Sequence, residues 1–294
     1  MTNGVCGTGE EVGLAKPPEH PDPWALAAHV AGGRSPFDFV EPPIWFSYSS
    51  FDTFDRCPRQ YAFRYLCHLP AEEPRPAAEF GSAAHGAFAA FTRERRDRPA
   101  RGEPGPDRAD LERFFESAWA RTSLSAEADA EIWRRRAEPM LDRFWASESA
   151  LQPETVGEEL RFRLGLQLDP DVFVVVTGYI DRVDRLPSGT VELIDYKSGP
   201  SASREAAEAS MQLSIYALAC RDALDLGRPE RVTFYCVEEG RRFSSERTDA
   251  ALDALRADLA ARAGRIRGGD FSPTPSRRSC SWCDFTALCP VNAR

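Results

Sequence analysis

The stretch GYIDRVDRLPSGTVELIDYKSG, residues 178–199, most constrains what this chain can fold into. Two strand-like runs flank the turn residues PSG, a pattern typical of an antiparallel hairpin. If the hairpin turns around Ser188, Asp181 lies directly opposite Asp195. Such neighbours on one face are roughly 4.5–5.5 Å apart at Cβ, where two like charges repel each other. The sequence therefore predicts a cation between these carboxylates.

Lys197 is one of only two lysines in a chain whose other 35 basic side chains are arginine. The strand period of two puts Lys197 on the face of Asp195, with Ile194 and Tyr196 pointing away. Two converging carboxylates suit Mg²⁺ or Mn²⁺. An adjacent ammonium can offset transition-state charge, a role that a planar guanidinium fills poorly. An exposed ion pair between Asp195 and Lys197 is the alternative, but the scarcity of lysine and the opposed Asp181 favour a catalytic role.

The rest of the chain predicts an α/β (α+β) fold with a mixed central β-sheet flanked by helices. The N-terminal half is mainly helical, and helical periodicity covers 49–69, capped by Ser49 or Ser50 and interrupted at Pro58, followed by 78–96, 108–122 and 127–149. Strand patterns cover 156–168, 171–186, 190–197, 231–239 and 241–246, and further helices are expected over 201–224 and 248–266.

Residues 1–43 are rich in glycine, proline and acidic side chains, so we expect a flexible extension with one short helical pattern at 23–31. A folded domain is expected over 44–294. It has a helical part at about 86–150, a metal-site core at about 155–240 and a C-terminal cysteine cluster at about 277–292. No signal peptide or membrane span is evident, which favours a soluble cytoplasmic protein.

Composition limits how such a protein could hold nucleic acid. The net charge is −9, which argues against binding through overall charge, so any basic surface must be local. Arginine clusters occur at 93–101, 133–138, 240–243, 261–269 and 275–280, although each could equally be a solvated helix face. Arg277 and Arg278 are the best candidates for DNA contact because they lie beside a cysteine cluster.

Cys280, Cys283 and Cys289 form a C-x₂-C-x₅-C arrangement that supplies three thiolates. In a reducing compartment, cysteines stay free or bind metal. A four-thiolate site needs one more cysteine, and spacing alone leaves Zn²⁺ and an iron-sulfur cluster equally open.

The 178–199 stretch resembles the core of the PD-(D/E)xK nuclease superfamily, whose RecB-like exonuclease branch has the pattern G-x-x-D-R-x-D, a turn, then D-Y-K-[ST]-G. Other motifs of that branch are similar to FSYSSFDTFDRCPRQYAFRYL, FGSAAHGAF, EELRFRL and MQLSIYALA, and they occur in the expected order. The resemblance covers about residues 45–292 and implies a restriction-endonuclease-like core.

The resemblance also implies residue roles. His85, Asp181 and Asp195 would hold the divalent metal with the backbone carbonyl of Tyr196, and Lys197 would be the catalytic base or transition-state stabiliser. Glu159 would support the metal site, with Glu158 as the alternative if the register shifts by one. Gln212 and Tyr216 would lie near the active site and the DNA backbone. Without the other motifs in their expected order, His85 would be interpreted as a partly buried surface histidine, and Gln212 and Tyr216 as residues that pack in the core.

The RCPRQ segment matches the distant first cysteine of iron-sulfur RecB-like nucleases such as the AddB and Cas4 groups, which makes Cys57 the implied fourth ligand of a [4Fe-4S] cluster, with Zn²⁺ as the alternative. Cys67 is a weaker competitor for this position. The cluster would join the N-terminal helix of the domain to its C-terminal tail.

The resulting functional prediction is a metal-dependent DNA exonuclease, acting on single-stranded or frayed ends in DNA repair, recombination or defence. Because the chain has no G-x-x-x-x-G-K-[ST] motif, unwinding would need a helicase or other repair or defence partner. The alternatives are a Cas4-like end-processing nuclease within a larger complex and a non-catalytic DNA-end-binding scaffold.

Overall fold

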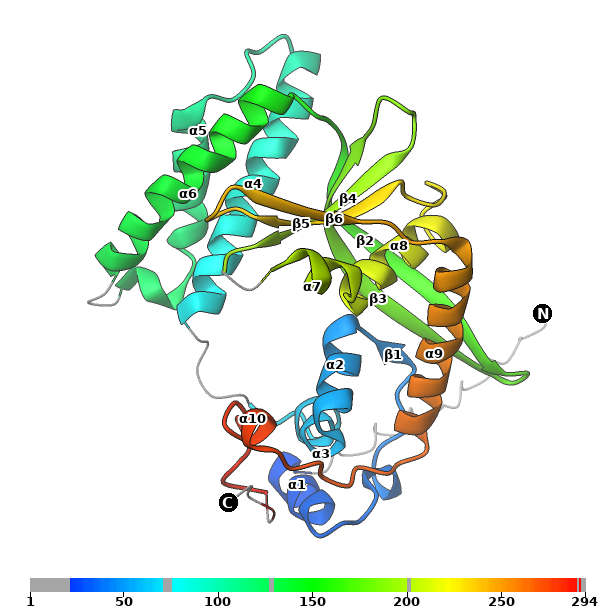
Figure 1. Cartoon of the computed structure of the whole chain (residues 1–294). Helices are drawn as coiled ribbons and strands as arrows, with labels where there is room; N and C mark the ends of the chain where they lie inside the picture. Colours follow the sequence, from blue (N-terminus) through cyan, green and yellow to red (C-terminus); the bar gives the residue numbers. More distant parts are fainter. Residues whose placement is uncertain (1–21, 71–75, 127–129, 200–201, 290, 292–294) are drawn as a thin grey trace, which may run out of the picture.

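A computed structural model describes residues 22–70, 76–126, 130–199, 202–289 and 291. Its centre is a mixed six-stranded sheet with helices on both faces (Figure 1), as the sequence predicts. The strands are β1 (Trp45–Phe46), β2 (Glu154–Asp169), β3 (Val172–Arg185), β4 (Val191–Lys197), β5 (Arg231–Cys236) and β6 (Arg241–Ser245).

Strand β3 organises the sheet. Along one edge it pairs antiparallel with β2, while its other edge pairs in parallel with β1 at Val175 and Val176 and antiparallel with β4 from Arg182 onward. The pairs Arg182↔Ile194 and Arg185↔Val191 centre the hairpin on Ser188 and confirm the predicted register. Asp181 therefore stands one step beyond the last β3–β4 pair, opposite Asp195.

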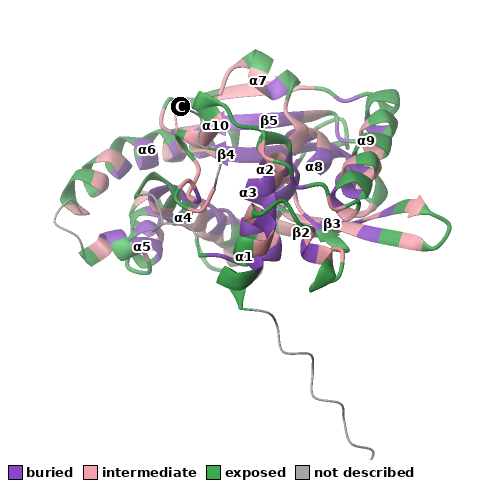
Figure 2. Cartoon of the chain, turned by 90° about the horizontal axis from the view of Figure 1, so that it is seen from below, coloured by how far each residue is buried: buried purple, intermediate pink, exposed green. Residues whose placement is uncertain are grey.

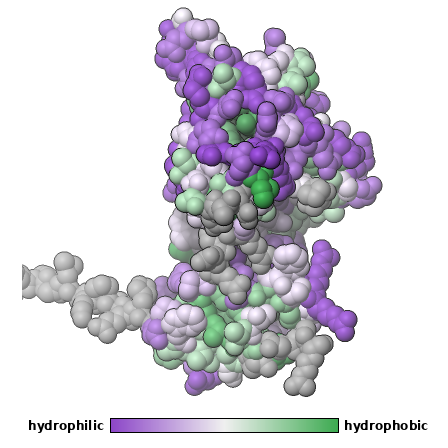
Figure 3. Space-filling model, turned by 90° about the vertical axis from the view of Figure 1, so that its left-hand side faces the viewer, coloured by the Kyte–Doolittle hydropathy of each residue, from purple (hydrophilic) through white to green (hydrophobic). Residues whose placement is uncertain are grey.

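Helices form a layer on each side of the sheet (Figure 1). One layer consists of α4 (Pro76–Ala100), α5 (Arg108–Trp119), η3 (Ser123–Ala126) and α6 (Ala130–Leu151). The remaining helices are α1 (Pro23–Ala31), η1 (Pro36–Asp38), α2 (Tyr48–Arg56), α3 (Pro58–Tyr61), η2 (Ala62–Leu66), α7 (Arg204–Glu208), α8 (Met211–Asp222), α9 (Asp249–Arg267) and α10 (Arg277–Cys280). The surface over the α4–α6 layer is mostly hydrophilic (Figure 3). Within the described residues, no helix combines the length and apolar character needed to cross a membrane.

Strand β4 separates two hydrophobic cores. Ile194 and Tyr196 belong to the core beneath α4–α6, whereas Leu193 belongs to the larger core with α8 and α9. The strand is thus buried on both faces, as the central purple segments of Figure 2 show. By alternation Asp195 faces α8, while the side chain of Tyr196 faces α4.

The helical pattern at 23–31 is present as α1, but the expectation of a flexible extension is wrong for 22–43, which packs on the domain, and 1–21 lie outside the described residues. Leu26 and Val30 of α1 are 3% and 1% exposed within the larger core. Arg59 Nη1 donates to the Ala31 carbonyl at 2.9 Å, and Arg267 Nη1 donates to the Pro43 carbonyl at 2.9 Å. Burial of the short apolar face of α1 in the core stabilises this segment, even though the surrounding composition is typical of a flexible chain.

Local chemistry sets two helix boundaries differently from expectation. Ser47, rather than Ser49 or Ser50, caps α2, and the Ser50 side chain completes a capping box. The helix expected over 201–224 is split into α7 and α8 because the Ser210 hydroxyl accepts from the Leu213 amide and starts a new helix. The expected interruption at Pro58 is present, with Cys57 extended at the break.

Gly178 on β3 offers a test of the β2–β3 packing. A Cβ there would lie 2.8 Å from Cζ of Phe162, a side chain only 2% exposed. We expect Gly178→Ala to lower the free energy of unfolding by ~1–3 kcal/mol, because the buried ring must shift. Gly264→Ala is the matched control, since nothing lies within 4 Å of a Cβ in the α9 interior. It should stabilise by ~0.5–1 kcal/mol. Urea unfolding measures both, and equal stability of Gly178→Ala and wild type would contradict this packing.

Candidate active site

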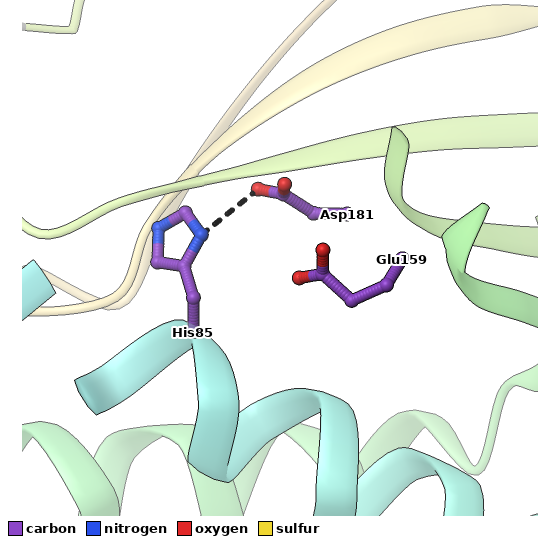
Figure 4. Close-up of side chains that lie close together, drawn as sticks. All are labelled: His85, Glu159 and Asp181. Carbon is purple, nitrogen blue, oxygen red and sulfur yellow. Dashed lines mark ion pairs between the residues drawn. The ribbon is translucent and has the colours of Figure 1, made fainter. Parts of the chain in front are cut away.

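Three potential metal ligands from three elements converge at one end of β3. His85 extends from α4, Glu159 from β2 and Asp181 from β3, and their ligand atoms all lie within 4.8 Å of one another (Figure 4). His85 Nδ1 is 3.4 Å from Asp181 Oδ2. This arrangement of one imidazole and two carboxylates is one that divalent cations bind.

The backbone explains why these side chains meet. Asp181 lies just before β3 begins to pair with β4, and its Oδ2 accepts from the Tyr196 amide at 2.8 Å. Glu159 has a φ of 48° and stands opposite Asp181, between the pairs Glu158↔Arg182 and Leu160↔Ile180. A non-glycine residue in the left-handed region is strained, a feature that clusters at functional sites.

Glu159, and not Glu158, faces the site. The Glu158 side chain instead pairs with Arg93 at 3.0 Å and with Arg96 at 2.5 Å, both on α4. The sequence pattern alone left both registers open, so the structure decides between them.

Lys197 is held on the α8 side of β4. Its Nζ lies 2.6 Å from Asp195 Oδ2 and donates to Gln212 Oε1 at 3.0 Å. The Gln212 side-chain amide in turn donates to Asp195 Oδ1 and to the Tyr216 hydroxyl, each at 2.8 Å. Gln212 therefore fixes the relative position of the lysine and the aspartate. The Tyr216 ring is only 6% exposed, and the predicted DNA contacts of Gln212 and Tyr216 remain predictions.

Asp195 is 2% exposed, and its Oδ2 is held by the ion pair with the Lys197 ammonium at 2.6 Å. The fit of the site to a divalent cation therefore rests on the convergent group of one imidazole and two carboxylates. Asp195 itself is not in the convergent group, so its predicted role as a ligand stays a prediction.

The electrostatics of the site favour a cation. Burial, followed by the charge of Asp195, raises the pKa of Asp181 well above its usual value, although the Tyr196 amide partly opposes this. Desolvation also raises the pKa of Glu159. Burial lowers the pKa of His85 below its usual value, so the imidazole is neutral at pH 7 and can act as a ligand.

A cleft of about 800 Å³ leads to these residues. Apart from His85 and Arg93, its α4 wall consists of small side chains, and the opposite wall includes Tyr196, Lys197 and Ser198. A Cβ on Gly81 would lie 2.7 Å from Ser198 Oγ, which explains the glycine in FGSAAHG. Arg93, which belongs to the arginine cluster at 93–101, and Arg121 also line the cleft, and no local pattern distinguishes Arg121 from other arginines.

The sequence analysis also missed the buried arginine beside Asp181. Arg182 is 0% exposed and donates to Asp184 Oδ1 at 2.7 Å, to Glu148 Oε1 at 2.8 Å and to the Tyr196 hydroxyl at 3.2 Å. The only local indication of its role is its position between two aspartates in DRVD. Its other partner, Glu148, lies on α6, and no local sequence pattern could have identified this long-range contact.

A second candidate site lies at the C-terminal end. Cys57, Cys280, Cys283 and Cys289 line one small pocket, as the resemblance implies. Cys67 is buried away from that pocket, and burial raises the pKa of its thiol to about 12. Arg277 and Arg278 begin α10 beside the pocket.

Comparison with known proteins identifies the family of the chain. A family model described as "PD-(D/E)XK nuclease superfamily" matches residues 45–290. The chain is similar to the "Gene 69 protein" of Mycobacterium phage L5, with 26% identity over 152 residues. That match covers 50% of this chain and 49% of the phage protein, so the chain spans about half the length of this curated relative. It is also similar to a solved structure described as "Crystal structure of SSO0001", with 13% identity, a TM-score of 0.42 and coverage of 92% of this chain and 97% of that one. A likeness this weak adds nothing to the fold assignment.

Asp181→Asn tests the site through stability. The pKa of Asp181 is raised in the folded protein, whereas in the unfolded chain an aspartate has a pKa of about 3.9. Ionisation of Asp181 therefore destabilises the fold increasingly as the pH rises above about 3.9. We expect the metal-free variant to melt above wild type at pH 8, with the difference shrinking as the pH falls through the raised pKa. Mn²⁺ at 100 times its Kd should stabilise wild type by about 2.7 kcal/mol and the variant far less.

Thermal unfolding with and without Mn²⁺ makes these measurements. The control is Asp171→Asn, which changes an exposed aspartate in the β2–β3 turn and should behave as wild type. Equal stabilisation of Asp181→Asn and wild type by Mn²⁺ would exclude Asp181 as a ligand.

Proposed function

We propose that this chain, which belongs to the PD-(D/E)XK nuclease superfamily, is a RecB-type DNA exonuclease that uses Mg²⁺ or Mn²⁺ and acts on single-stranded or frayed ends. The observation that carries the proposal is the convergence of His85, Glu159 and Asp181 beside Lys197 on one cleft. Nucleases of this superfamily use divalent metals, and the donor set is of the kind that holds them.

The cation would be held by the His85 imidazole and the Asp181 and Glu159 carboxylates, with Asp195 and the Tyr196 carbonyl as the further predicted ligands. When bound, the cation supplies Lewis acidity toward the phosphate and lowers the pKa of water. Its charge would also offset the burial of Asp181 and the repulsion from Asp195, the two effects that most raise the pKa of Asp181.

Lys197 supplies a fixed positive charge at the cleft wall. The side chain is 32% exposed, so the ammonium can reach a phosphate while Asp195 and Gln212 hold its position. A preorganised cation stabilises the charge that develops on the phosphate during hydrolysis. His85, neutral at pH 7, binds rather than repels a metal ion.

The lining of the cleft supports the proposed substrate. The small residues of its α4 wall let a sugar-phosphate backbone approach closely, and Arg121 adds positive charge to the lining. This shape supports a single strand or a frayed end in repair, recombination or defence, with unwinding left to a partner such as a helicase.

We also propose that Cys57, Cys280, Cys283 and Cys289 hold a [4Fe-4S] cluster. The four cysteines line one small pocket, which supports a shared site for them, and four thiolates are a ligand set that holds either such a cluster or the alternative Zn²⁺.

The cluster would reinforce contacts that already join the two ends of the domain. Thr274 Oγ1 donates to the Arg56 carbonyl at 2.9 Å, and Arg59 Nε donates to the Phe271 carbonyl at 3.3 Å. Arg277 and Arg278 form no ion pair with a described carboxylate, which leaves both free to bind DNA phosphates.

Lys197→Ala should lower the cleavage rate of a labelled single-stranded oligonucleotide at least about 100-fold in Mg²⁺ or Mn²⁺, because the transition state loses a positioned cation. Lys197→Arg should also be impaired, since a planar guanidinium does not fit between Asp195 and Gln212. Arg135→Ala, on the outer surface of α6, is the control and should cleave as wild type. If Lys197→Ala and wild type, purified in parallel, degrade DNA equally, the proposed mechanism is wrong.

Anaerobically purified wild type should be brown, with visible absorption and about four irons per chain. Cys57→Ala should lose colour and iron and melt at a lower temperature, whereas Cys67→Ala should keep both colour and iron. Iron analysis and absorption spectra make the comparison. A colourless wild-type protein with stoichiometric zinc would overturn the cluster assignment.

A further inference from the structure

The outer face of the β2–β3 hairpin carries side chains that the proposed catalysis does not use. Arg161 pairs across the strands with Tyr179, and Arg163 pairs with Thr177. The alternate residues, such as Phe162 and Ile180, are 2% and 0% exposed in the larger core. Period-two alternation therefore turns the arginines and the tyrosine toward solvent. Trp45 lies on β1 beside them, opposite Val175.

This outer face continues from the active site. Tyr179 precedes Asp181 by two residues on β3, and Arg161 follows Glu159 by two residues on β2. At about 3.4 Å per residue, the tyrosine lies roughly 7 Å along the strand from the site. A strand of nucleic acid that leaves the cleft in this direction meets Tyr179 and Arg161 first.

The two arginines are available to bind phosphate. Both are exposed, and neither forms an ion pair with a carboxylate in the described ranges. On α4, by contrast, the exposed residues Arg93 and Arg96 are both paired with Glu158, and Arg101, just after the helix, is paired with Glu94. In a chain of net charge −9, unpaired arginines on one strand face concentrate positive charge where anions can reach it.

Aromatic rings lie among these charges. Trp45 and Tyr179 are each 50% exposed, and the Arg163 guanidinium carbon lies 5.6 Å from the centroid of the Trp45 ring. Single-strand binding surfaces combine cationic side chains with aromatic rings on which unpaired bases stack. The same composition is found here on a surface that leads to a candidate nuclease site.

We propose that the outer face of β2–β3, with Trp45, is a binding track for single-stranded DNA. The bases stack on Tyr179 and Trp45, and Arg161 and Arg163 bind the phosphates. The proposal rests on the proposed function, since it extends the path of that substrate beyond the cleft. It selects a single strand over a duplex because only unpaired bases expose faces to these rings.

The test is fluorescence anisotropy of a labelled oligothymidylate in EDTA, which prevents cleavage, over a series of NaCl concentrations. The double variant Arg161→Ala/Arg163→Ala should bind more weakly and lower the slope of log K against log salt by about 1.4, that is about 0.7 per lost phosphate contact. Tyr179→Ala should weaken binding by about tenfold with the slope unchanged, because it removes one stacked base.

Two controls match these changes. Arg134→Ala/Arg135→Ala alters the net charge equally on the outer surface of α6, where both arginines are paired with glutamates, and should keep the wild-type slope. Tyr179→Phe retains the ring and should bind as wild type. Circular dichroism melting checks that each variant is folded.

Three results would overturn the track: equal slopes for the two double variants, wild-type affinity of Tyr179→Ala, or tighter binding of wild type to duplex than to the single strand. Because these measurements involve no cleavage, they are independent of the Lys197→Ala result. A protein that binds DNA through this face without cleaving it would contradict the proposed function and support the track.

Discussion

The buried guanidinium of Arg182 is the interaction on which the rest of the structure depends. It joins Glu148 of the helical layer to Asp184 on β3 and to the Tyr196 hydroxyl on β4. Glu148 and Asp184 are themselves only 2% and 3% exposed, so each charge requires the others. Removing one partner of such a group leaves an uncompensated buried charge and costs ~3–5 kcal/mol. The α4–α6 layer is therefore held against the sheet by charge as well as by apolar packing.

This network positions the active site through a single residue. The side chain of Tyr196 is fixed by Arg182, and the Tyr196 amide is bonded to Asp181. Asp195 and Lys197, on either side, point to the opposite face, where Gln212 holds them. One short strand thus has a structural face and a chemical face, because its side chains alternate while its backbone is common to both.

The site itself works against the stability of the fold. Asp181, Asp195 and Glu159 place like charges close together, and the pKa values of Asp181 and Glu159 are raised by burial and by neighbouring negative charges. Burial without full compensation is typical of functional sites, where the missing partner is a ligand. A similar contrast holds for the arginines, since Arg93 and Arg96 of α4 are paired with Glu158, while Arg161 and Arg163 on the outer β2–β3 face have no ion pair among the described residues.

The sequence by itself determined the hairpin register, the shared face of Asp195 and Lys197, the helical first half and the mixed sheet, because strand alternation, turn residues and helical periodicity are local. The tertiary structure decided what depends on distant contacts. It chose Glu159 over Glu158, joined Arg182 to Glu148, and ordered residues 22–43, for which composition had indicated flexibility. It also brought Arg163 to Trp45, more than one hundred residues apart in the chain. Local sequence patterns determine the direction in which a side chain points, because they depend on neighbouring residues alone. The residues that it contacts are determined by the tertiary structure, because they come from distant parts of the chain.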